Sequence, residues 1–507
     1  MRLNDHMRDY LSLMTAVALS RWLFRSHYLY DMDSVNFALG LAHFSPALHQ
    51  PHPPGYFLYI QLGRVAQLLF PDANDALVVL SIFGSVALVG LIYALARAWF
   101  GREAARFAGL FFVFSPLVWF HGIVALTYIL EACFTGLFGL LCWHVYMGRN
   151  SMAVPAAVVL GLAVGMRQST ILFLAPLCLL SLQKTSLRKG LVAVCAFVVT
   201  VGVWFLPMLA ASGGAEIYFG ALRDLWERVS DAPASLTLNW LKLIVLRMGL
   251  LLMTYGICFG TAAPLLFLRS LPIHFNPGLK IFLAVWLIPG LLFFTVLFFS
   301  SNNLGYLLFL AVPLFAVLGA KGAMWYNQSQ ASLRVKLATI GAFAAVNVAI
   351  FLYAPLYTSY RAITQYEHEL VTIPNTLRKM ADPSDTVIVA MDAHWFGFRH
   401  AGYYLPEYLV LQYPEMKFAA GIRVFVMRSR NTQLLQALPV SRYKRFVLFP
   451  FPEDSPGDQA FIKKLLDRFP KGTLTTISAG GHKYVTGPAT YLDRLFPQTT
   501  NVSQTIP

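Results

Sequence analysis

The stretch Tyr30-Asp31-Met32-Asp33-Ser34, followed by His49-Gln50-Pro51-His52-Pro53-Pro54-Gly55-Tyr56, comes directly after the first long apolar segment of the chain. If that segment crosses a bilayer, two carboxylates and two imidazoles lie where the chain has just left it. Ionisable side chains are costly inside hydrocarbon but can carry charge at its edge. The pattern therefore indicates chemistry at a membrane surface, on a substrate that is itself partly in lipid.

The composition predicts a polytopic membrane protein. Of the 507 residues, 57% are hydrophobic and only 12% are charged, whereas a soluble domain has about half apolar and about a quarter charged residues. The net charge of +15 comes from Lys and Arg residues that lie largely in short loops between apolar segments. This distribution is typical of membrane topology and not of a nucleic-acid surface, so we expect no nucleic-acid partner.

About eleven segments are apolar enough to span a membrane, which takes roughly twenty residues in a helix. They lie near 10–29, 76–97, 106–121, 124–147, 152–166, 168–183, 190–210, 239–268, 281–300, 304–321 and 337–355.

The basic residues predict the orientation of these spans. When the spans are counted in order, the basic groups fall on the same side as the N-terminus, and the positive-inside rule makes that side cytoplasmic. Three parts of the chain are then outside, namely 30–75, 211–238 and everything after about 356. The groups that set this alternation are Arg2 and Arg8; Arg97, Arg102 and Arg106; Arg149; Lys184, Arg188 and Lys189; Arg269 and Lys280; and Lys321, Arg334 and Lys336.

After Tyr357 the hydrophobic runs shorten to the length of strands, and helix-like stretches such as Phe461–Phe469 separate several of them. This alternation predicts a small α/β domain with a partly parallel sheet. We therefore expect a membrane domain over 1–356 and an extracytoplasmic α/β domain over 357–507. The domain has no Gly-rich phosphate loop, so no nucleotide cofactor is expected. The predicted strands are Thr386–Met391, Tyr408–Gln412, Arg423–Met427, Arg445–Phe449 and Leu474–Ile477.

Asp31 and Asp33 are the first candidates for chemistry. Two carboxylates at this spacing can serve as a general base or can both face a divalent cation in a turn. The competing interpretation is helix capping, because Asp33-Ser34 precedes the helix-like stretch Val35–Phe44 and Asp is a good N-cap residue. Both interpretations hold if one Asp caps the helix while the other reacts.

His49 and His52 flank Pro51 and, with Pro53-Pro54-Gly55, form a rigid turn, because proline fixes its own φ and restricts the residue before it. The turn leads into another apolar helix, Tyr56–Phe70, which we expect along the membrane surface. Imidazoles on such a turn can hold a phosphate or a metal near the carboxylates. The alternative is that they only anchor the turn.

Three basic residues are candidates for binding an anion. Arg167 interrupts an apolar run, which is costly at the centre of a bilayer but not at the end of a span, where the side chain can snorkel. The predicted topology puts Arg167 at the outer face, and a guanidinium binds phosphate through two parallel hydrogen bonds. Lys242 and Arg247, at the start of the eighth predicted span, either add to an anion site or contact lipid headgroups.

Two residues near the start of the fourth predicted span are candidates for lining a cavity. Glu131 lies about one turn inside that span, and His121 lies in the short outer loop before it. The alternative is that either residue pairs with an arginine inside the helix bundle.

The pattern of these residues resembles the GT-C superfamily of integral-membrane glycosyltransferases. It is most similar to the protein O-mannosyltransferase-like branch, including bacterial relatives with an Asp-Ser and His-Pro-Pro-Gly-Tyr-Pro-Leu-Tyr pattern. The matching residues here are Asp33-Ser34 and His52–Tyr59, and the likeness extends loosely over 1–355. Two further stretches are similar, namely Phe114-Ser115-Pro116 with Trp119 and Tyr128, and the Gly-x-x-x-Gly-x-Arg-x-Ser stretch Gly161–Ser169.

The resemblance implies an enzyme that takes a sugar from a polyprenyl-phosphate donor and passes it to a protein, lipid or cell-wall glycan acceptor at the outer face. Asp33 would be the general base of an inverting attack. Asp31 would be a supporting acidic residue beside this base. The anion of the donor would be bound by Arg167, Arg247, Lys242 and His52, and the prenyl tail would lie among the spans and membrane lipids. The residues expected to line the cavity are His49, Tyr56, His121, Tyr128 and Glu131.

The resemblance also implies a hexosyl or mannosyl type of transfer and a bacterial inner membrane with the C-terminal domain in the periplasm. The chain departs from the family in two places. Adjacent Asp-Glu is usual at the catalytic position of the mannosyltransferases, whereas Asp31-Met32-Asp33 resembles metal-using members, so a divalent metal at Asp31 and Asp33 stays open. Glu131 is displaced from the position just before Tyr128 where relatives often place a Glu.

Two other functions fit the same composition. One is a transporter or flippase for a lipid-linked saccharide, a class that generally has internal repeats and broken helices at the midplane. The other is a protein that binds a glycolipid without turning it over, which gains support if Asp33 only caps a helix.

Overall fold

A computed structural model describes residues 5–229, 238–268, 270–271, 273, 275–297, 304–391, 396–413, 417–420, 423–426 and 442–495. The contacts divide the chain into two compact units. The helical unit comprises Met1–His27 and Pro53–Ile363, and the sheet unit comprises Tyr28–His52 and Thr364–Pro507. The segment that carries Asp31, Asp33, His49 and His52 therefore belongs to the same unit as the C-terminal part of the chain.

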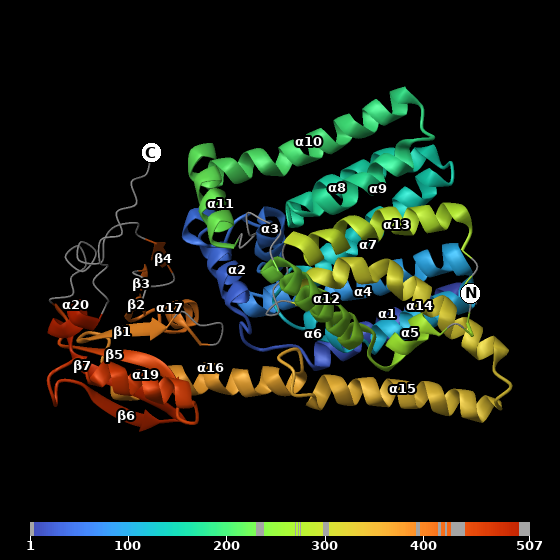
Figure 1. The fold of residues 1–507 in the computed structure, drawn as a ribbon. Helices are drawn as coiled ribbons and strands as arrows, with labels where there is room; N and C mark the ends of the chain where they lie inside the picture. The colour runs from blue at the N-terminus through green and yellow to red at the C-terminus, as the bar shows by residue number, and fades with distance from the viewer. Residues whose placement is uncertain are drawn as a thin grey trace. The chain divides into compact units, whose positions relative to one another are not determined.

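The helical unit is built almost entirely of α-helices, because a bilayer offers its backbone no hydrogen-bond partner outside the helix. Its α-helices, labelled in Figure 1, are α1 (Asp5–Leu23), α3 (Phe57–Ala66), α4 (Ala73–Phe100), α5 (Arg102–Val113), α6 (Pro116–His121), α7 (Tyr128–Tyr146), α8 (Ala153–Met166), α9 (Thr170–Leu182), α10 (Leu187–Ala211), α11 (Ala215–Val229), α12 (Leu238–Phe259), α13 (Pro277–Leu292), α14 (Leu308–Gln328) and α15 (Leu333–Tyr353).

Several of these helices can cross a membrane. Seven helical segments in the described part of the chain are long and apolar enough, and the segments Asn150–Met166 and Thr170–Leu182 are shorter and also apolar. Each of the eleven predicted spans overlaps at least one helix. The chain is thus an integral membrane protein, while the number of eleven spans and the cytoplasmic N-terminus stay predictions.

The centre of the helical unit is formed by α4, α5, α7 and α14, which pack on one another. Gly319 of α14 lies against Ala104 and Ala108 of α5, so closely that a Cβ atom at this glycine would collide with both. Small residues allow helices to approach in this way inside a bilayer. Of the most apolar 18-residue stretch, 83% is buried in the segment that contains α14 and only 11% in α15. Helix α15 therefore exposes most of its apolar surface to lipid.

The sheet unit contains a seven-stranded sheet in the order β4-β3-β2-β1-β5-β7-β6. The strands are β1 (Thr386–Met391), β2 (Leu409–Tyr413), β3 (Lys417–Ala420), β4 (Arg423–Val426), β5 (Arg445–Pro452), β6 (Thr475–Ala479) and β7 (His482–Pro488). The helices of this unit are α2 (Met32–Ala42), α16 (Tyr360–Met380), which begins in the helical unit, α17 (Phe398–Tyr404), α19 (Pro456–Leu466) and α20 (Leu492–Leu495).

The predicted partly parallel sheet is confirmed. Strand β1 pairs in parallel with β2 on one side and with β5 on the other, and all other pairings are antiparallel among the described strands. The prediction missed two strands, β3 and β7. Strand β7, which ends in Val485-Thr486-Gly487-Pro488, mixes apolar and turn-forming residues, so that its local pattern gives no clear strand signal.

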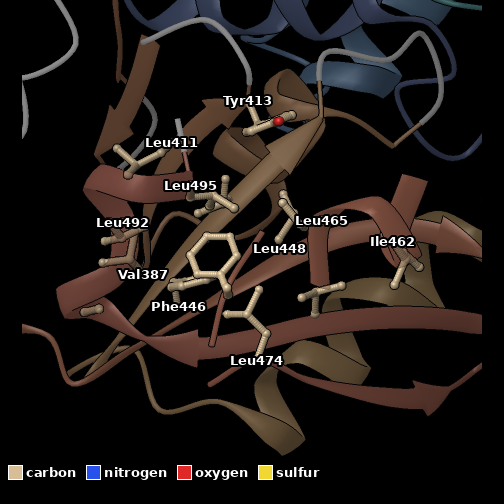
Figure 2. Close-up of a cluster of buried hydrophobic side chains, with 14 of the residues drawn as sticks. Val387, Leu411, Tyr413, Phe446, Leu448, Ile462, Leu465, Leu474, Leu492 and Leu495 are labelled. Carbon is tan, nitrogen blue, oxygen red and sulfur yellow. The ribbon is translucent and has the colours of Figure 1, made fainter. Parts of the chain in front are cut away.

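One hydrophobic core cluster of the sheet unit lies on one face of the sheet, while β1 and β2 are buried on both faces. Alternate residues of neighbouring strands, such as Val387, Leu411 and Leu448, point to this face, as the two-residue period of a strand requires. Figure 2 shows them meeting Leu465 of α19 and Leu495 of α20. Helix α17 packs against β1 and β2 and also against α2, and so connects the sheet to the segment that precedes and follows Asp33.

Candidate functional site

Helix α2 begins with a capping box that uses Asp31. The Asp31 carboxylate accepts a hydrogen bond from the Asp33 amide at 2.8 Å, and the Ser34 hydroxyl accepts one from the Asp31 amide at 3.4 Å. Of the two aspartates that the sequence offered as caps, Asp31 is the N-cap, and the helix begins at Met32, three residues before the predicted helix-like stretch. The two carboxylates have different surroundings from the first turn onwards.

Asp33 lies in the first turn of α2 beside His52. The distance between Asp33 Oδ1 and His52 Nδ1 is 3.3 Å, and the side chains are 19% and 16% exposed. The His52 ring also lies next to the Phe37 ring, with 6.1 Å between centroids. A carboxylate that is partly open and adjacent to an imidazole can accept a proton from a substrate hydroxyl and hold it there.

The Asp31 carboxyl titrates differently from an ordinary aspartate. Burial, and after it the charge of Asp33, raises the pKa of Asp31 from 3.8 to about 7, against the lowering effect of the hydrogen bond from the Asp33 amide. Two nearby carboxylates favour one proton between them. Asp31 is therefore suited to keep a proton near neutral pH.

Helices α16 and α17 hold the chain just before Asp31. The Tyr404 hydroxyl accepts a hydrogen bond from the Leu29 amide at 2.9 Å. His400 Nε2 lies 3.3 Å from the Leu29 carbonyl oxygen and 3.1 Å from the Tyr366 hydroxyl. The ring of Tyr366 also meets the ring of Tyr30 edge to face, at 5.5 Å between centroids. The backbone that leads into α2 is thus fixed by residues from the C-terminal part of the chain.

The chain after α2 is held in a similar way. Arg399 of α17 donates a hydrogen bond from Nη1 to the Leu48 carbonyl oxygen at 3.2 Å. Ser45 and Gln50 pair through two backbone hydrogen bonds of 2.7 and 2.9 Å. Between them His49 adopts a left-handed conformation with φ of 58°. This tight turn leads the chain towards His52.

A second polar cluster lies in the helical unit around Arg167 and Glu131. Arg167 Nη1 lies 3.1 Å from Glu131 Oε2, and the two side chains are 12% and 3% exposed. The other oxygen of Glu131 accepts a hydrogen bond from the Thr170 hydroxyl at 3.0 Å. Glu131 therefore pairs with an arginine, as one of its two interpretations predicted, because a buried carboxylate needs such compensation.

Aromatic rings surround the Arg167 guanidinium. Its carbon lies 4.2 Å from the ring centre of Tyr306 and 5.6 Å from that of Tyr128. The Tyr128 ring in turn meets the His121 ring at 5.2 Å, and Tyr56 adds a further electrostatic interaction with Arg167. The structure thus gathers four of the predicted cavity residues, namely Tyr56, His121, Tyr128 and Glu131, around Arg167.

The turn that follows His52 is tied to the same region of the helical unit. Gln168, next to Arg167, donates from Nε2 to the Pro54 carbonyl oxygen at 3.3 Å, and the Tyr218 hydroxyl donates to the same oxygen at 3.2 Å. Tyr56 then starts α3 in a left-handed conformation with φ of 44°. These contacts fix the Pro-Pro-Gly turn that the sequence predicted to be rigid.

Lys242 and Arg247 have other surroundings. Arg247 lies in α12 and donates from Nη1 to the Val296 carbonyl oxygen at 2.7 Å. Lys242, one and a half turns earlier in the same helix, is exposed. Of the other two predicted anion ligands, Arg167 pairs with Glu131 and His52 lies beside Asp33.

The sequence did not single out several residues that build these clusters. Tyr306 and Thr170 complete the surroundings of Arg167 and Glu131, and Tyr366, His400 and Tyr404 hold the chain before Asp31. Each lies far along the chain from its partner or in an ordinary apolar segment. No local spacing in the sequence marks them.

The Asp31-Met32-Asp33 spacing left open whether these aspartates bind a divalent metal ion, and the structure gives little support for such a site. Within the described ranges, no three or more His, Cys, Asp and Glu side chains are grouped so that they could hold a metal ion. Asp31 is engaged in the helix cap and Asp33 faces His52. The described donor set does not fit a divalent cation.

Comparisons with known proteins agree with this architecture. Residues 41–191 match the family described as the Protein O-mannosyl-transferase TMEM260 N-terminal domain. Among solved structures, ArnT from Cupriavidus metallidurans bound to undecaprenyl phosphate is similar. The match covers 96% of this chain and 99% of the ArnT chain, with a TM-score of 0.56 and 13% sequence identity. Its apo state covers the same shares, with a TM-score of 0.57 at 14% identity. No curated protein sequence matches the chain.

These likenesses confirm the resemblance to the GT-C glycosyltransferases. The fold is shared with ArnT along nearly the whole of both chains. The family match includes His52, Tyr56, Glu131 and Arg167 and begins after Asp33. The chain is thus an integral membrane protein that shares its fold with ArnT and is similar over residues 41–191 to the family described above.

The contact of α17 with the segment before Asp31 can be tested directly. Tyr404→Phe removes the acceptor of the Leu29 amide hydrogen bond, which is worth about 1 kcal/mol, so this segment should open more often. We expect faster hydrogen–deuterium exchange of peptides that cover 28–34 in the full-length protein. Tyr491→Phe, the same change elsewhere in the sheet unit, should leave that exchange unchanged, and equal exchange in both variants would contradict the assignment.

The raised pKa of Asp31 predicts a pH dependence of stability. Between about pH 4 and pH 7 the folded state keeps a proton on Asp31 that the unfolded state has lost, so this group makes the free energy of unfolding fall as pH rises through that window. Asp31→Asn should remove this fall while keeping the cap. Thermal unfolding midpoints in detergent from pH 4 to pH 8 measure it, and identical pH profiles for both proteins would refute it.

Proposed function

We propose that this protein is a glycosyltransferase that moves a sugar from a polyprenyl-phosphate donor to an acceptor hydroxyl at the outer face of a membrane. The observation that carries the proposal is the division of labour between the two aspartates. Asp31 closes the cap of α2, while Asp33 stays partly exposed beside His52. The GT-C resemblance supplies the reaction class, and this pair supplies a base suited to it.

In the proposed reaction Asp33 is the general base. Its carboxylate takes the proton of the acceptor hydroxyl while the acceptor oxygen forms a bond to the anomeric carbon of the sugar. The bond from that carbon to the phosphate oxygen breaks with inversion, and its electron pair leaves with the polyprenyl phosphate. The proton then rests on Asp33, where the neighbouring His52 supports the change in charge.

The leaving group is already an anion, so it needs nearby positive charge more than a strong acid. Arg167 is proposed to bind the phosphate of the donor. Glu131 holds this guanidinium through one nitrogen, and the rings of Tyr128 and Tyr306 limit its rotamers. A guanidinium has five N–H donors, so an arginine held in this way keeps others for a ligand.

ArnT is described as bound to undecaprenyl phosphate, and by analogy the proposed donor carries a lipid of this class. The proposal includes a membrane domain over 1–356 and an extracytoplasmic C-terminal domain over 357–507, in a bacterial inner membrane. A hexosyl or mannosyl type of sugar is proposed from the resemblance alone. The acceptor is a protein, a lipid or a cell-wall glycan.

The role of Asp33 predicts that Asp33→Asn folds normally and loses transfer activity by at least about a hundredfold, the usual contribution of a general base. Transfer from radiolabelled polyprenyl-phosphate sugars by purified protein in detergent measures this, with EDTA lanes for metal dependence. Asp75→Asn, the same change at the acidic residue in the first turn of α4, is the control. Turnover by Asp33→Asn at the wild-type rate would exclude Asp33 as the base, and donor binding without any transfer would favour a flippase or a non-catalytic binder.

The role of Arg167 predicts weaker donor binding when its charge is removed. Because Arg167→Ala alone would leave Glu131 buried without its ion-pair partner, the double variant Arg167→Gln/Glu131→Gln is the better test. We expect its affinity for polyprenyl phosphate to fall roughly tenfold or more, with acceptor affinity nearly unchanged. Glu131→Gln alone should keep the affinity for the phosphate, and a double variant with wild-type donor affinity would overturn the assignment.

A further inference from the structure

A charged cavity lies at one end of the helical unit, away from Arg167. It has a volume of about 660 Å³ and is lined by the first turns of α1 and α5, the last turn of α14 and the start of α15. Its charged residues are Asp5, Arg8, Asp9, Arg102, Glu103 and Arg106. Three cations and three anions in one cavity make it nearly neutral overall while keeping both signs of charge within reach of one ligand.

Asp9 organises the cationic side of this cavity. Its carboxylate accepts hydrogen bonds from Arg102 Nε at 2.7 Å and from Nε and Nη2 of Arg106, both at 2.9 Å. Within the part of the chain that the structure describes, these bonds and the one from Arg102 Nη1 to Asp5 leave Arg102 Nη2 and Arg106 Nη1 for a ligand. Two guanidiniums fixed side by side suit a phosphate group.

The anionic side consists of Asp5 and Glu103. Glu103 Oε2 accepts a hydrogen bond from Asn327 Nδ2 at 2.6 Å, which fixes the side chain. Asp5 Oδ2 accepts the bond from Arg102 at 3.1 Å, and the Asp5 side chain is 66% exposed. Each carboxylate has a second oxygen that can accept from an ammonium group, which carries three donors and no acceptor.

An apolar groove continues from the charged cavity. It has a volume of about 360 Å³ and shares Phe107, Leu110 and Ile340 with that cavity. The groove runs between α5, α14 and α15, and residues such as Phe343 and Val346 of α15 line it. Since α15 is the least buried of the apolar helices, the groove is open to a hydrocarbon chain from the bilayer.

We propose that the helical unit binds a zwitterionic glycerophospholipid, phosphatidylethanolamine, with its head group in the charged cavity and one acyl chain in the groove. The phosphate lies on Arg102 and Arg106, and the ammonium lies on Asp5 and Glu103. An anionic lipid would leave both carboxylates facing its negative charge, so the balanced charges favour the zwitterion. The predicted orientation makes this the cytoplasmic end, and the inference does not depend on the proposed transfer reaction.

The proposal is tested by native mass spectrometry of the full-length protein released from detergent with equal amounts of phosphatidylethanolamine, phosphatidylglycerol and phosphatidylcholine. We expect one retained phosphatidylethanolamine, several times more than either other lipid. Phosphatidylcholine is a strict comparison because its quaternary ammonium has no N–H to donate. Equal retention of the three lipids, or a preference for phosphatidylglycerol, would overturn the choice of head group.

Two pairs of variants separate the head-group site from the tail site. Glu103→Gln keeps an acceptor for Asn327 but removes the charge, and it should reduce the preference for phosphatidylethanolamine roughly fivefold to tenfold. Glu216→Gln, an exposed change in α11, is its control.

Thr339→Trp fills the groove from an exposed position and should reduce retention of all three lipids, whereas Ala338→Trp, on the neighbouring position outside the groove, should not. Unchanged retention in both Glu103→Gln and Thr339→Trp would refute the site.

Discussion

The structure depends on one constraint above others: a charged group that is buried in a low-dielectric interior must have a partner of opposite charge or lose its charge. Glu131 meets this constraint with Arg167 and Thr170. Asp9 meets it with Arg102 and Arg106. Asp31 meets it by a raised pKa and a helix cap. In each of these three clusters the buried carboxyl group is thus compensated.

The same constraint explains why the two aspartates of one short motif differ. A helix has one N-cap residue, and in α2 that residue is Asp31. Asp33, two residues later, faces His52 and remains partly exposed. The contacts of α17 with Leu29 and Leu48 then fix both ends of the segment that carries this pair. The C-terminal part of the chain therefore holds this segment in place, apart from any role in recognising an acceptor.

The two polar clusters of the helical unit differ in the ligand they suit. Around Arg167 a single guanidinium is enclosed by aromatic rings and one carboxylate, which suits one phosphate. Between α1 and α5 both signs of charge are spread over a larger cavity that opens into an apolar groove, which suits a whole lipid. Under the proposed function, the protein binds a lipid-linked donor among phospholipids, and this distribution of charge gives a physical basis for binding the two at different sites.

The sequence by itself determined the helical membrane part, the partly parallel sheet and the residue types of the Asp33 and His52 motif. Apolar runs long enough to span a bilayer and short runs of strand length are local patterns, so they can be read without any knowledge of packing. The tertiary structure decided which aspartate caps α2, that Glu131 pairs with Arg167, and that His400 and Tyr404 hold Leu29. Apart from the local cap, these pairings join residues 36 to 375 positions apart, and only the packing of the folded chain brings such residues together.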